Sequence, residues 1–400
     1  MRDRSDEIRR LAELAVEFGA NVQPGQILAV QTYPGMEALT RAVAKVGYGR
    51  GARYVDVVYF DLWVKRERIA GAPDDSLGEV PPWLVERLEW LSQQHAARVT
   101  FTAPEPGVFD GLDATRAGRD LMPYLPNTGA VVNSRTTNWN IIPSPTPRWA
   151  DAVYPDLPPD EAYDRLWDVI VHICRLDEPD AAAAWTERME TLKSVASRIS
   201  QRHFDKIRLH GEGTDLTVGL FRSSEWHAAE FETVDGLSFY PNLPSEEMFT
   251  TPDPARTEGY VTATLPKELY GSLIEGIKLE FEGGRVTRVD ADRGADALRS
   301  VVSRDEGASY LGEVALVDGA GRIGALGTVF FDTLIDENAA SHIALGNGYE
   351  LTVLDPAEKA RIAKSEVHAD VMIGSPELHV DGITDSGETV PLLRGGAWQI

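Results

Sequence analysis

Four short segments in the second half of the chain carry acids and histidines among otherwise apolar residues. They are NLPSEEMFTTP, LGEVALV, FDTLIDENAASHIALGNGYE and HADVMIG, and the six candidate ligands among their residues are four carboxylates and two imidazoles. One divalent cation would leave this set at a charge of about −2, whereas two would bring it close to neutral. Oxygen and imidazole ligands without thiolate suit zinc, cobalt or manganese, and a bridged pair of ions suits hydrolysis. The sequence predicts two divalent metal ions held by Glu247, Glu313, Glu337, His342, His368 and Asp370.

Two of these segments have the period-2 alternation of β-strands. In LGEVALV the alternation places Glu313 on the same face as Leu311 and Ala315, so a carboxylate enters apolar surroundings and needs a partner. The alternative is an edge strand on which Glu313 faces water. In HADVMIG, His368 and Asp370 are two residues apart and share one face. The alternative for His368 is an exposed position at the start of the strand.

The segment FDTLIDENAASHIALGNGYE needs a break in its local structure if its ligands are to meet. Glu337 and His342 are five residues apart, which separates them by roughly 140° on an α-helix. They converge only if Glu337 precedes the helix. Asn338 is a suitable cap for a helix that begins at Ala339, so we expect Glu337 in a loop and His342 on that helix. Tyr349 would emerge just beyond the end of the helix.

Adjacent glutamates in NLPSEEMFTTP leave two questions open. The segment could simply be the start of a short helix, with Ser245 as its cap and the acids placed favourably for the helix dipole. If the segment does bind metal, only one of Glu246 and Glu247 needs to face the ions, and we assign that role to Glu247. A further alternating segment, GSPELHVDGI, follows a turn and is assigned to structure, with its residues Glu377, His379 and Asp381.

The elements that must position these residues fall into two parts. The first part alternates helices and strands, which is typical of a doubly wound parallel sheet. After a long helix over residues 180–202 the pattern changes to strands and turns. We therefore expect an N-terminal α/β domain over residues 1–203 and a mixed α+β catalytic domain over residues 204–400. In the first part, helices are expected over 5–18, 35–50, 81–97 and 157–174, and strands over 27–31, 54–60 and 98–105.

Composition excludes several classes of partner. The 63 acidic and 39 basic side chains give a net charge of −24, which repels nucleic acid and anionic membrane surfaces. The single cysteine, Cys174, lies in an apolar helical pattern and is expected to be buried and inert. The chain begins with a charged amphipathic pattern and contains no apolar run of membrane-spanning length, so a cytoplasmic location is expected.

The metal-site segments, together with GTDLTVGL and NVQPGQ, resemble the thermophilic metallo-aminopeptidases of the aminopeptidase T, aminopeptidase II and aminopeptidase S type. The similarity runs in order along essentially the whole chain, and the DENAASH block is highly specific. HExxH is absent, and this family does not use it. The resemblance implies a dinuclear site with the six ligands named above and a catalytic tyrosine at Tyr349. It also implies homodimers in which the N-terminal domain of one subunit helps to wall the active-site cavity of the other.

The function expected on this basis is removal of N-terminal residues from peptides with a free α-amino group. Water activated between two metal ions would attack the scissile carbonyl. Glu313 would pass a proton to the leaving amine in addition to binding metal, and Tyr349 would donate a hydrogen bond to the oxyanion. Two alternatives stay open: a dipeptidase or amidase that uses the same metals, and a metal- or peptide-binding protein without turnover.

Overall fold

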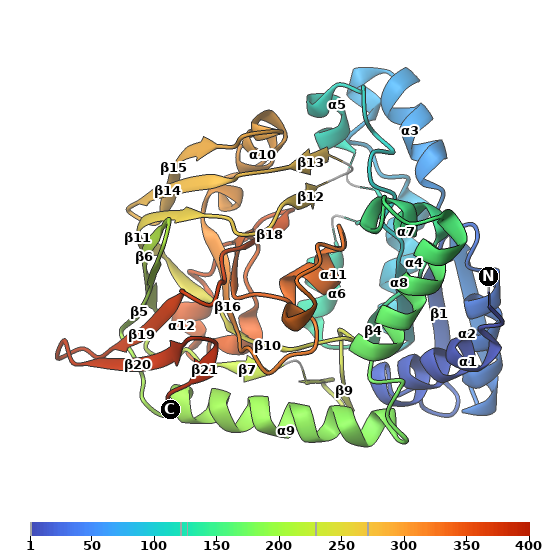
Figure 1. The fold of residues 1–400 in the computed structure, drawn as a ribbon, viewed down its shortest axis with the longest axis horizontal. Helices are drawn as coiled ribbons and strands as arrows, with labels where there is room; N and C mark the ends of the chain where they lie inside the picture. Colours follow the sequence, from blue (N-terminus) through green and yellow to red (C-terminus); the bar gives the residue numbers. More distant parts are fainter. Residues whose placement is uncertain (1, 121, 126, 229, 270–271) are drawn as a thin grey trace. The chain divides into compact units, whose positions relative to one another are not determined.

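The structure is a computed structural model that describes residues 2–120, 122–125, 127–228, 230–269 and 272–400, and it divides into two compact units (Figure 1). The first unit comprises Met1–Glu187 and Ala229–Ser245, and the second comprises Arg188–Ala228 and Glu246–Ile400. The division falls inside helix α9 (Ala181–Ser200), so this helix belongs to both units. The first boundary between the units therefore lies at residue 187, earlier than the boundary expected at residue 203. Residues 229–245 belong to the first unit, although they come later in the chain.

The first unit is built on a parallel sheet of four strands in the order β2-β1-β3-β4. The chain runs from β1 to β2 on one side and then returns past β1 to β3 and β4 on the other side. Because crossovers between parallel strands are right-handed, the connecting helices before and after this reversal lie on opposite faces of the sheet. The predicted doubly wound α/β architecture is therefore confirmed. Strand β1 is buried at five of its six positions, as expected for a strand covered on both faces. The strands are β1 (Ile27–Thr32), β2 (Tyr54–Tyr59), β3 (Ala97–Thr102) and β4 (Asn138–Pro143).

The four predicted helices of this unit begin within two residues of the predicted positions, and three of them end one to four residues earlier. The first predicted helix is α-helical over Ser5–Glu13 and continues as a π-helical segment, η1, over Leu14–Gly19. A short hairpin of β8 (Phe231–Glu232) and β9 (Ser238–Phe239) completes the unit. The remaining helices are α2 (Glu37–Gly49), α3 (Leu62–Gly71), η2 (Asp74–Ser76), α4 (Pro82–Gln93), α5 (Ala114–Arg119), α6 (Thr128–Ser134), α7 (Pro147–Val153) and α8 (Pro159–Ile173).

Strand β4 was not predicted, because asparagines occupy two of its buried positions. The side-chain amide of Asn138 donates to the carbonyl of Ala20 (2.5 Å), and that of Asn140 donates to the carbonyl of Tyr240 (2.7 Å). These bonds satisfy polar groups that would otherwise be costly to bury. Tertiary partners, rather than the local pattern, therefore make β4 a strand.

The second unit contains two large antiparallel sheets. The five-stranded sheet has the order β18-β17-β16-β10-β7, and it carries the segments that the sequence marked as metal-binding. Its strands are β7 (His227–Ala228), β10 (Glu247–Thr250), β16 (Leu311–Val317), β17 (His342–Gly346) and β18 (His368–Met372).

The eight-stranded sheet has the order β15-β14-β11-β6-β5-β19-β20-β21. Its strands are β5 (Lys206–Gly211), β6 (Thr214–Leu220), β11 (Pro252–Thr262), β14 (Lys278–Glu282), β15 (Arg285–Asp290), β19 (His379–Ile383), β20 (Thr389–Arg394) and β21 (Ala397–Trp398). The unit also contains the hairpin of β12 (Lys267–Leu269) and β13 (Ser272–Ile274). Its short helices are α10 (Ala295–Val302), η3 (Gly307–Ser309), η4 (Gly324–Leu326), α11 (Thr333–Glu337), η5 (Glu350–Thr352) and α12 (Pro356–Lys359).

The prediction of a helix that begins at Ala339 is wrong. A helix does form in this segment, but it is α11, which lies before Ala339 and is capped by the carboxylate of Asp332 accepting from the Ile335 N–H. Glu337 is the last residue of α11 rather than part of a loop. His342 begins strand β17, because this segment hydrogen-bonds to β16 on one side and to β18 on the other. Two ladders of hydrogen bonds outweigh the local helix signal.

Two structural alternatives for the acidic segments are also wrong. Ser245 does not open a helix, since the residues that follow it form strand β10. Strand β16 is not an edge strand, because it lies between β10 and β17, and Glu313 on it is 4% exposed. Both glutamate segments therefore place carboxylates inside the five-stranded sheet.

Two further observations concern the chain as a whole. Cys174 is fully buried, as expected, and burial raises the pKa of its thiol. Among the described residues, no helix combines the length and the apolar character that crossing a bilayer requires.

Candidate metal centre

The pairing of the five-stranded sheet brings the predicted ligands to one of its faces. In an antiparallel sheet, directly paired residues share a face, and so do residues two apart on one strand. Glu313 and Asp370 both pair with Ala344, and His342 lies two residues before Ala344. His368 lies two residues before Asp370. Four predicted ligands therefore share one face, across strands β16, β17 and β18.

Glu247 joins the same face through strand β10. It pairs with Val317, which lies four residues after Glu313 on β16. Ala315 and Ala344 occupy the middle of this face and are fully buried. Their small side chains leave room above the sheet for the longer acidic and imidazole groups around them.

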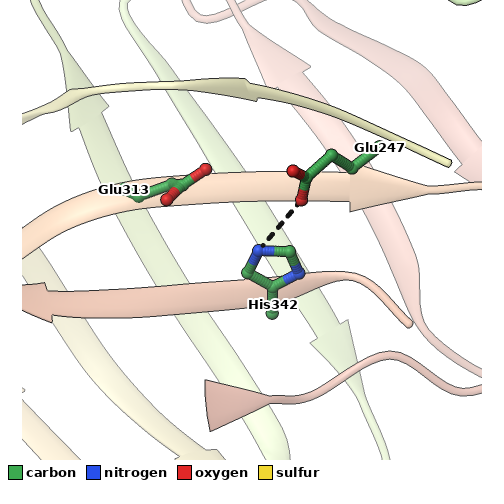
Figure 2. Close-up of side chains that lie close together, drawn as sticks. All are labelled: Glu247, Glu313 and His342. Atoms are coloured by element: carbon green, nitrogen blue, oxygen red, sulfur yellow. Dashed lines mark ion pairs between the residues drawn. The ribbon is translucent and has the colours of Figure 1, made fainter. Parts of the chain in front are cut away.

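The side chains form two overlapping groups of possible ligands within the described residues. Glu247, Glu313 and His342 make one group, and Glu313, His368 and Asp370 make the other, with the ligand atoms of each within 4.8 Å of one another. Figure 2 shows the first group, with its dashed line joining Glu247 to His342. Glu313 belongs to both groups, so its carboxylate lies where two adjacent ions could share it.

Both histidines have the hydrogen bonding of metal ligands. His342 Nδ1 lies 3.2 Å from the Ala340 carbonyl, and His368 Nδ1 lies 3.0 Å from the Asn347 carbonyl. A carbonyl only accepts, so in the neutral ring the proton is on Nδ1 and the lone pair is on Nε2. Backbone carbonyls commonly orient metal-binding histidines in this way.

The Nε2 atoms face carboxylate oxygens. His342 Nε2 lies 3.2 Å from Glu247 Oε2, a buried oxygen without a hydrogen-bond partner in the described part of the chain. His368 Nε2 lies 3.0 Å from Glu313 Oε2 and 3.2 Å from Asp370 Oδ1. With neutral rings these are acceptors facing acceptors, an arrangement that a bound cation satisfies. The residues therefore fit divalent metal ions.

Glu337 lies outside both groups. Its side chain projects from the end of α11, where the Asn338 amide lies 3.5 Å from Glu337 Oε1. Burial raises the pKa of Glu337 well above its usual value, and the charges of Asp370 and Glu247 add to the effect. It therefore belongs to the same electrostatic cluster, although its carboxylate is not within the distances that define the two groups.

The neighbouring glutamates of NLPSEEMFTTP have different partners. Glu247 faces His342, whereas Glu246 Oε2 lies 2.5 Å from Arg188 Nε in a buried ion pair. Arg188 also binds Asp318 (2.8 Å), and the Glu246 N–H donates to Asn338 Oδ1 (2.6 Å). The geometry supports Glu247 as the member of the pair directed at the centre.

Tyr349 lies beside the second group. Its ring centroid is 5.4 Å from that of His368 and 5.2 Å from that of Phe249. Thr251 fixes the backbone of Tyr349, because its Oγ1 accepts from the Tyr349 N–H (2.9 Å) and donates to the Tyr349 carbonyl (3.2 Å). Burial raises the pKa of the Tyr349 hydroxyl well above its usual value, and the carboxylates led by Glu313 raise it further.

The carboxylates and His368 influence one another strongly in the metal-free chain. Burial raises the pKa of Glu247 well above its usual value, and Glu313 and Asp370 raise it further. Burial opposes the charged form of His368, but Asp370 and Glu313 outweigh it and raise its pKa. Burial likewise opposes ionisation of Asp370, yet His368 and Lys267 hold its pKa well below the usual range.

Sequence reasoning missed Lys267 and Arg188 near the centre, and it assigned Asn338 to a helix cap rather than to contact with Glu246. Lys267 is 3% exposed and its Nζ lies 3.8 Å from Asp370 Oδ2. Arg188 donates to the Glu246 carboxylate, and Asn338 accepts from the Glu246 N–H. Nothing in the local pattern of Lys267 or Arg188 separates them from surface positions. Lys267 also changes the charge count, since two divalent ions now leave about +1 and one leaves about −1. Charge therefore does not decide the number of ions, and the sharing of Glu313 becomes the stronger argument.

Comparison with known proteins places this geometry in context. A family model described as thermophilic metalloprotease (M29) matches residues 4–398. The chain is 40% identical to aminopeptidase T of Thermus aquaticus, with 99% of each chain covered, and 34% identical to aminopeptidase 2 of Geobacillus stearothermophilus, with 98% and 97% covered. Its fold matches a solved structure of wild-type AmpT from Thermus thermophilus with a TM-score of 0.89, 38% identity and full coverage of both chains.

Proposed function

The chain belongs to the thermophilic metalloprotease (M29) family and is a metallo-aminopeptidase, and we propose that its two overlapping ligand groups hold a pair of divalent ions. One observation carries the proposal: Glu313 belongs to both groups, and each group presents a histidine Nε2 to a carboxylate. Zinc, cobalt and manganese suit these oxygen and nitrogen ligands. Glu337 would complete the set from the end of α11.

The proposed reaction is hydrolysis of the first peptide bond of a peptide with a free N-terminus. Ions bound at the centre would supply Lewis-acid activation of water and of the scissile carbonyl. We assign Glu313 to carry a proton to the leaving amine, because its carboxylate lies at the middle of the cluster. A free α-amino group can donate several hydrogen bonds to carboxylate oxygens of the cluster, which favours a substrate with an unblocked N-terminus.

Tyr349 would donate a hydrogen bond to the oxyanion as it forms. Its raised pKa keeps the hydroxyl protonated at neutral pH, so it can act as a donor. Packing against Phe249 and His368 limits the movement of the ring, which favours a donor held in place before the reaction. Side chains that are fixed in advance need little reorganisation when charge develops.

The number of ions is the central test. The chain is stripped with a chelator, reconstituted with Zn²⁺, Co²⁺ or Mn²⁺, and the bound metal is measured by elemental analysis while release of leucine from a leucine-initiated peptide is followed. We expect activity to reach its maximum at two ions per chain. Full activity at one ion per chain would contradict the dinuclear proposal, and full activity without transition metal would remove the role of metal altogether.

We also propose that the chain forms a homodimer. Several aromatic side chains of the first unit are exposed in the single chain, and exposed aromatic groups are enriched at protein interfaces. Helix α4 and strand β2, which both carry exposed aromatic residues, are held together by an ion pair between Arg87 and Asp56 (2.6 Å). The aromatic residues are Tyr48, Tyr54, Tyr59, Trp63, Trp83 and Trp90. Light scattering of the purified chain measures the oligomeric state, and a monomer at micromolar concentration would contradict the proposal. The cytoplasmic location stays a prediction.

A further inference from the structure

Lys267 is a buried cation inside the acidic cluster. It lies on β12, which belongs to a separate two-stranded hairpin and not to the sheet that carries the ligands. Its Nζ lies 3.8 Å from Asp370 Oδ2 and donates to Thr333 Oγ1 at 3.3 Å. Thr333 is the first residue of α11, the helix that ends at Glu337. The ammonium therefore bridges a proposed ligand on β18 and the helix that carries another.

The two oxygens of Asp370 have different neighbours. Oδ1 lies 3.2 Å from His368 Nε2, whereas Oδ2 lies 3.8 Å from Lys267 Nζ. The lysine thus occupies the side of the carboxylate that faces away from the histidine. Its charge acts most directly on Asp370 and also acts on Glu337. It is not among the main charges acting on Glu247, at the other end of the cluster.

We propose that Lys267 is a built-in counter-ion of the metal centre. Without metal it offsets part of the charge of the four carboxylates and so stabilises the empty, folded site. With metal it repels the ion held by Glu313, His368 and Asp370, because two cations then share one carboxylate. The ion in this group is consequently bound more weakly than the ion held by Glu247, Glu313 and His342. The inference rests on the proposed function, since it takes a divalent ion as the ligand.

Charge-removing variants separate this role from a purely structural one. Lys267→Met keeps most of the length of the side chain and Lys267→Gln keeps a hydrogen-bond donor, while both remove the charge. Lys267→Arg keeps the charge, and Lys278→Met, at a lysine that is 57% exposed, is the matched control. Each chain is stripped of metal and titrated with Co²⁺ alone in a calorimeter, and its melting temperature is measured with chelator and with saturating Co²⁺.

In both neutral variants we expect the weaker Co²⁺ dissociation constant to fall by at least about tenfold, the low end of what a buried charge a few ångströms away produces. Their melting temperature in chelator should fall, so the difference between the melting temperatures with saturating Co²⁺ and with chelator should increase. Lys267→Arg and Lys278→Met should stay close to the unmodified chain. A lysine that only fills space would give weaker Co²⁺ binding, or lower melting temperatures in both conditions by the same amount.

Unchanged or weaker Co²⁺ binding in the folded neutral variants would overturn the inference. If they do not fold without metal, they are purified with Co²⁺ and challenged with chelator, and the expected result is slower release of Co²⁺; equal or faster release overturns it. The unmodified chain reports separately on the proposed function, because binding of fewer than two Co²⁺ ions there would contradict the dinuclear centre whatever the variants show.

Discussion

Glu246 and Glu247 are adjacent in the chain, yet their carboxylates enter two separate buried networks. Glu247 Oε2 lies 3.2 Å from His342 Nε2, and Glu246 Oε2 lies 2.5 Å from Arg188 Nε. In extended backbone, successive side chains point to opposite sides. The start of β10 therefore presents one glutamate to the candidate metal centre and gives the other to an ion pair that holds the strand.

These two glutamates should respond differently to the same substitution. Glu247→Gln should lower both the bound metal and the activity, because a proposed ligand is lost. Glu246→Gln should keep the metal but lower the free energy of unfolding by about 1–3 kcal/mol, because Arg188 then keeps Asp318 as its buried carboxylate partner but loses the other. Elemental analysis and urea denaturation measure the two effects. If Glu246→Gln lost metal and Glu247→Gln did not, Glu246 rather than Glu247 would be the ligand.

Substitution of the shared ligand should affect both ions. Glu313→Gln is expected to lower the occupancy of both sites, because Glu313 belongs to both groups, whereas Asp370→Asn should affect mainly the group that contains His368. Elemental analysis at limiting Zn²⁺ measures the occupancy. Glu377→Gln is the control, at an exposed position outside the five-stranded sheet. Equal, partial loss of metal in Glu313→Gln and Asp370→Asn would argue against a bridging carboxylate.

Tyr349→Phe removes one hydroxyl and leaves the ring that packs against Phe249 and His368. Turnover should fall by about 10²- to 10³-fold, the usual cost of losing one oxyanion donor, with little change in bound metal or melting temperature. Steady-state kinetics on a leucine-initiated peptide measure the loss. A variant with normal turnover would show that the tyrosine serves packing alone.

Stabilisation by metal should increase as the pH rises from about 5 to 8. In the metal-free fold, the pKa values of Glu247 and Glu337 lie above their usual 4.5 and that of His368 lies above 6.5. Each group then binds its proton more tightly folded than unfolded, so its contribution to stability is present at low pH and is lost as the pH rises through the folded pKa. Asp370, whose pKa is lowered from 3.8, acts in the opposite sense only below this window.

Metal ions compete with these same protons for the ligands, so they bind better as the pH rises. The difference in melting temperature between saturating Zn²⁺ and chelator, measured at several pH values, isolates the effect from the other titratable groups of the chain. A difference that is constant or shrinks between about pH 5 and pH 8 would show that these groups do not bind the metal.

The substrate should need a free α-amino group. A peptide that is cleaved after its first residue should become inert when it is N-acetylated, because acetylation removes the charge-assisted hydrogen bonds that a free α-amino group can donate to the carboxylates. Amidation of the C-terminus should matter little. A mass-spectrometric time course on the free, acetylated and amidated peptides distinguishes these cases. Cleavage of the acetylated peptide would indicate a general amidase, and a requirement for the free C-terminus would indicate a dipeptidase or carboxypeptidase.

The sequence was sufficient where the signal is local and repeated. Alternation of helices and strands predicted the doubly wound sheet, since period 3.6 and period 2 leave distinct marks on apolar residues. Strands β16 and β18 were predicted for the same reason, and their alternation fixed which of their residues share a face. The resemblance of DENAASH and its neighbouring segments identified the family, because residue types at fixed spacings can be read without any coordinates.

Tertiary structure decided what depends on partners far away in the chain. His342 lies on a strand because β16 and β18 supply two hydrogen-bonding neighbours, an arrangement that no local propensity reveals. Glu246 is turned to Arg188, and Lys267 reaches Asp370 from a separate hairpin. Burial and long-range electrostatics set these outcomes, because the energy of a charge depends on what surrounds it in space rather than in sequence. The sequence therefore determined the kinds of ligand and the chemistry that they suit, and the fold decided which carboxylates meet and which cation lies among them.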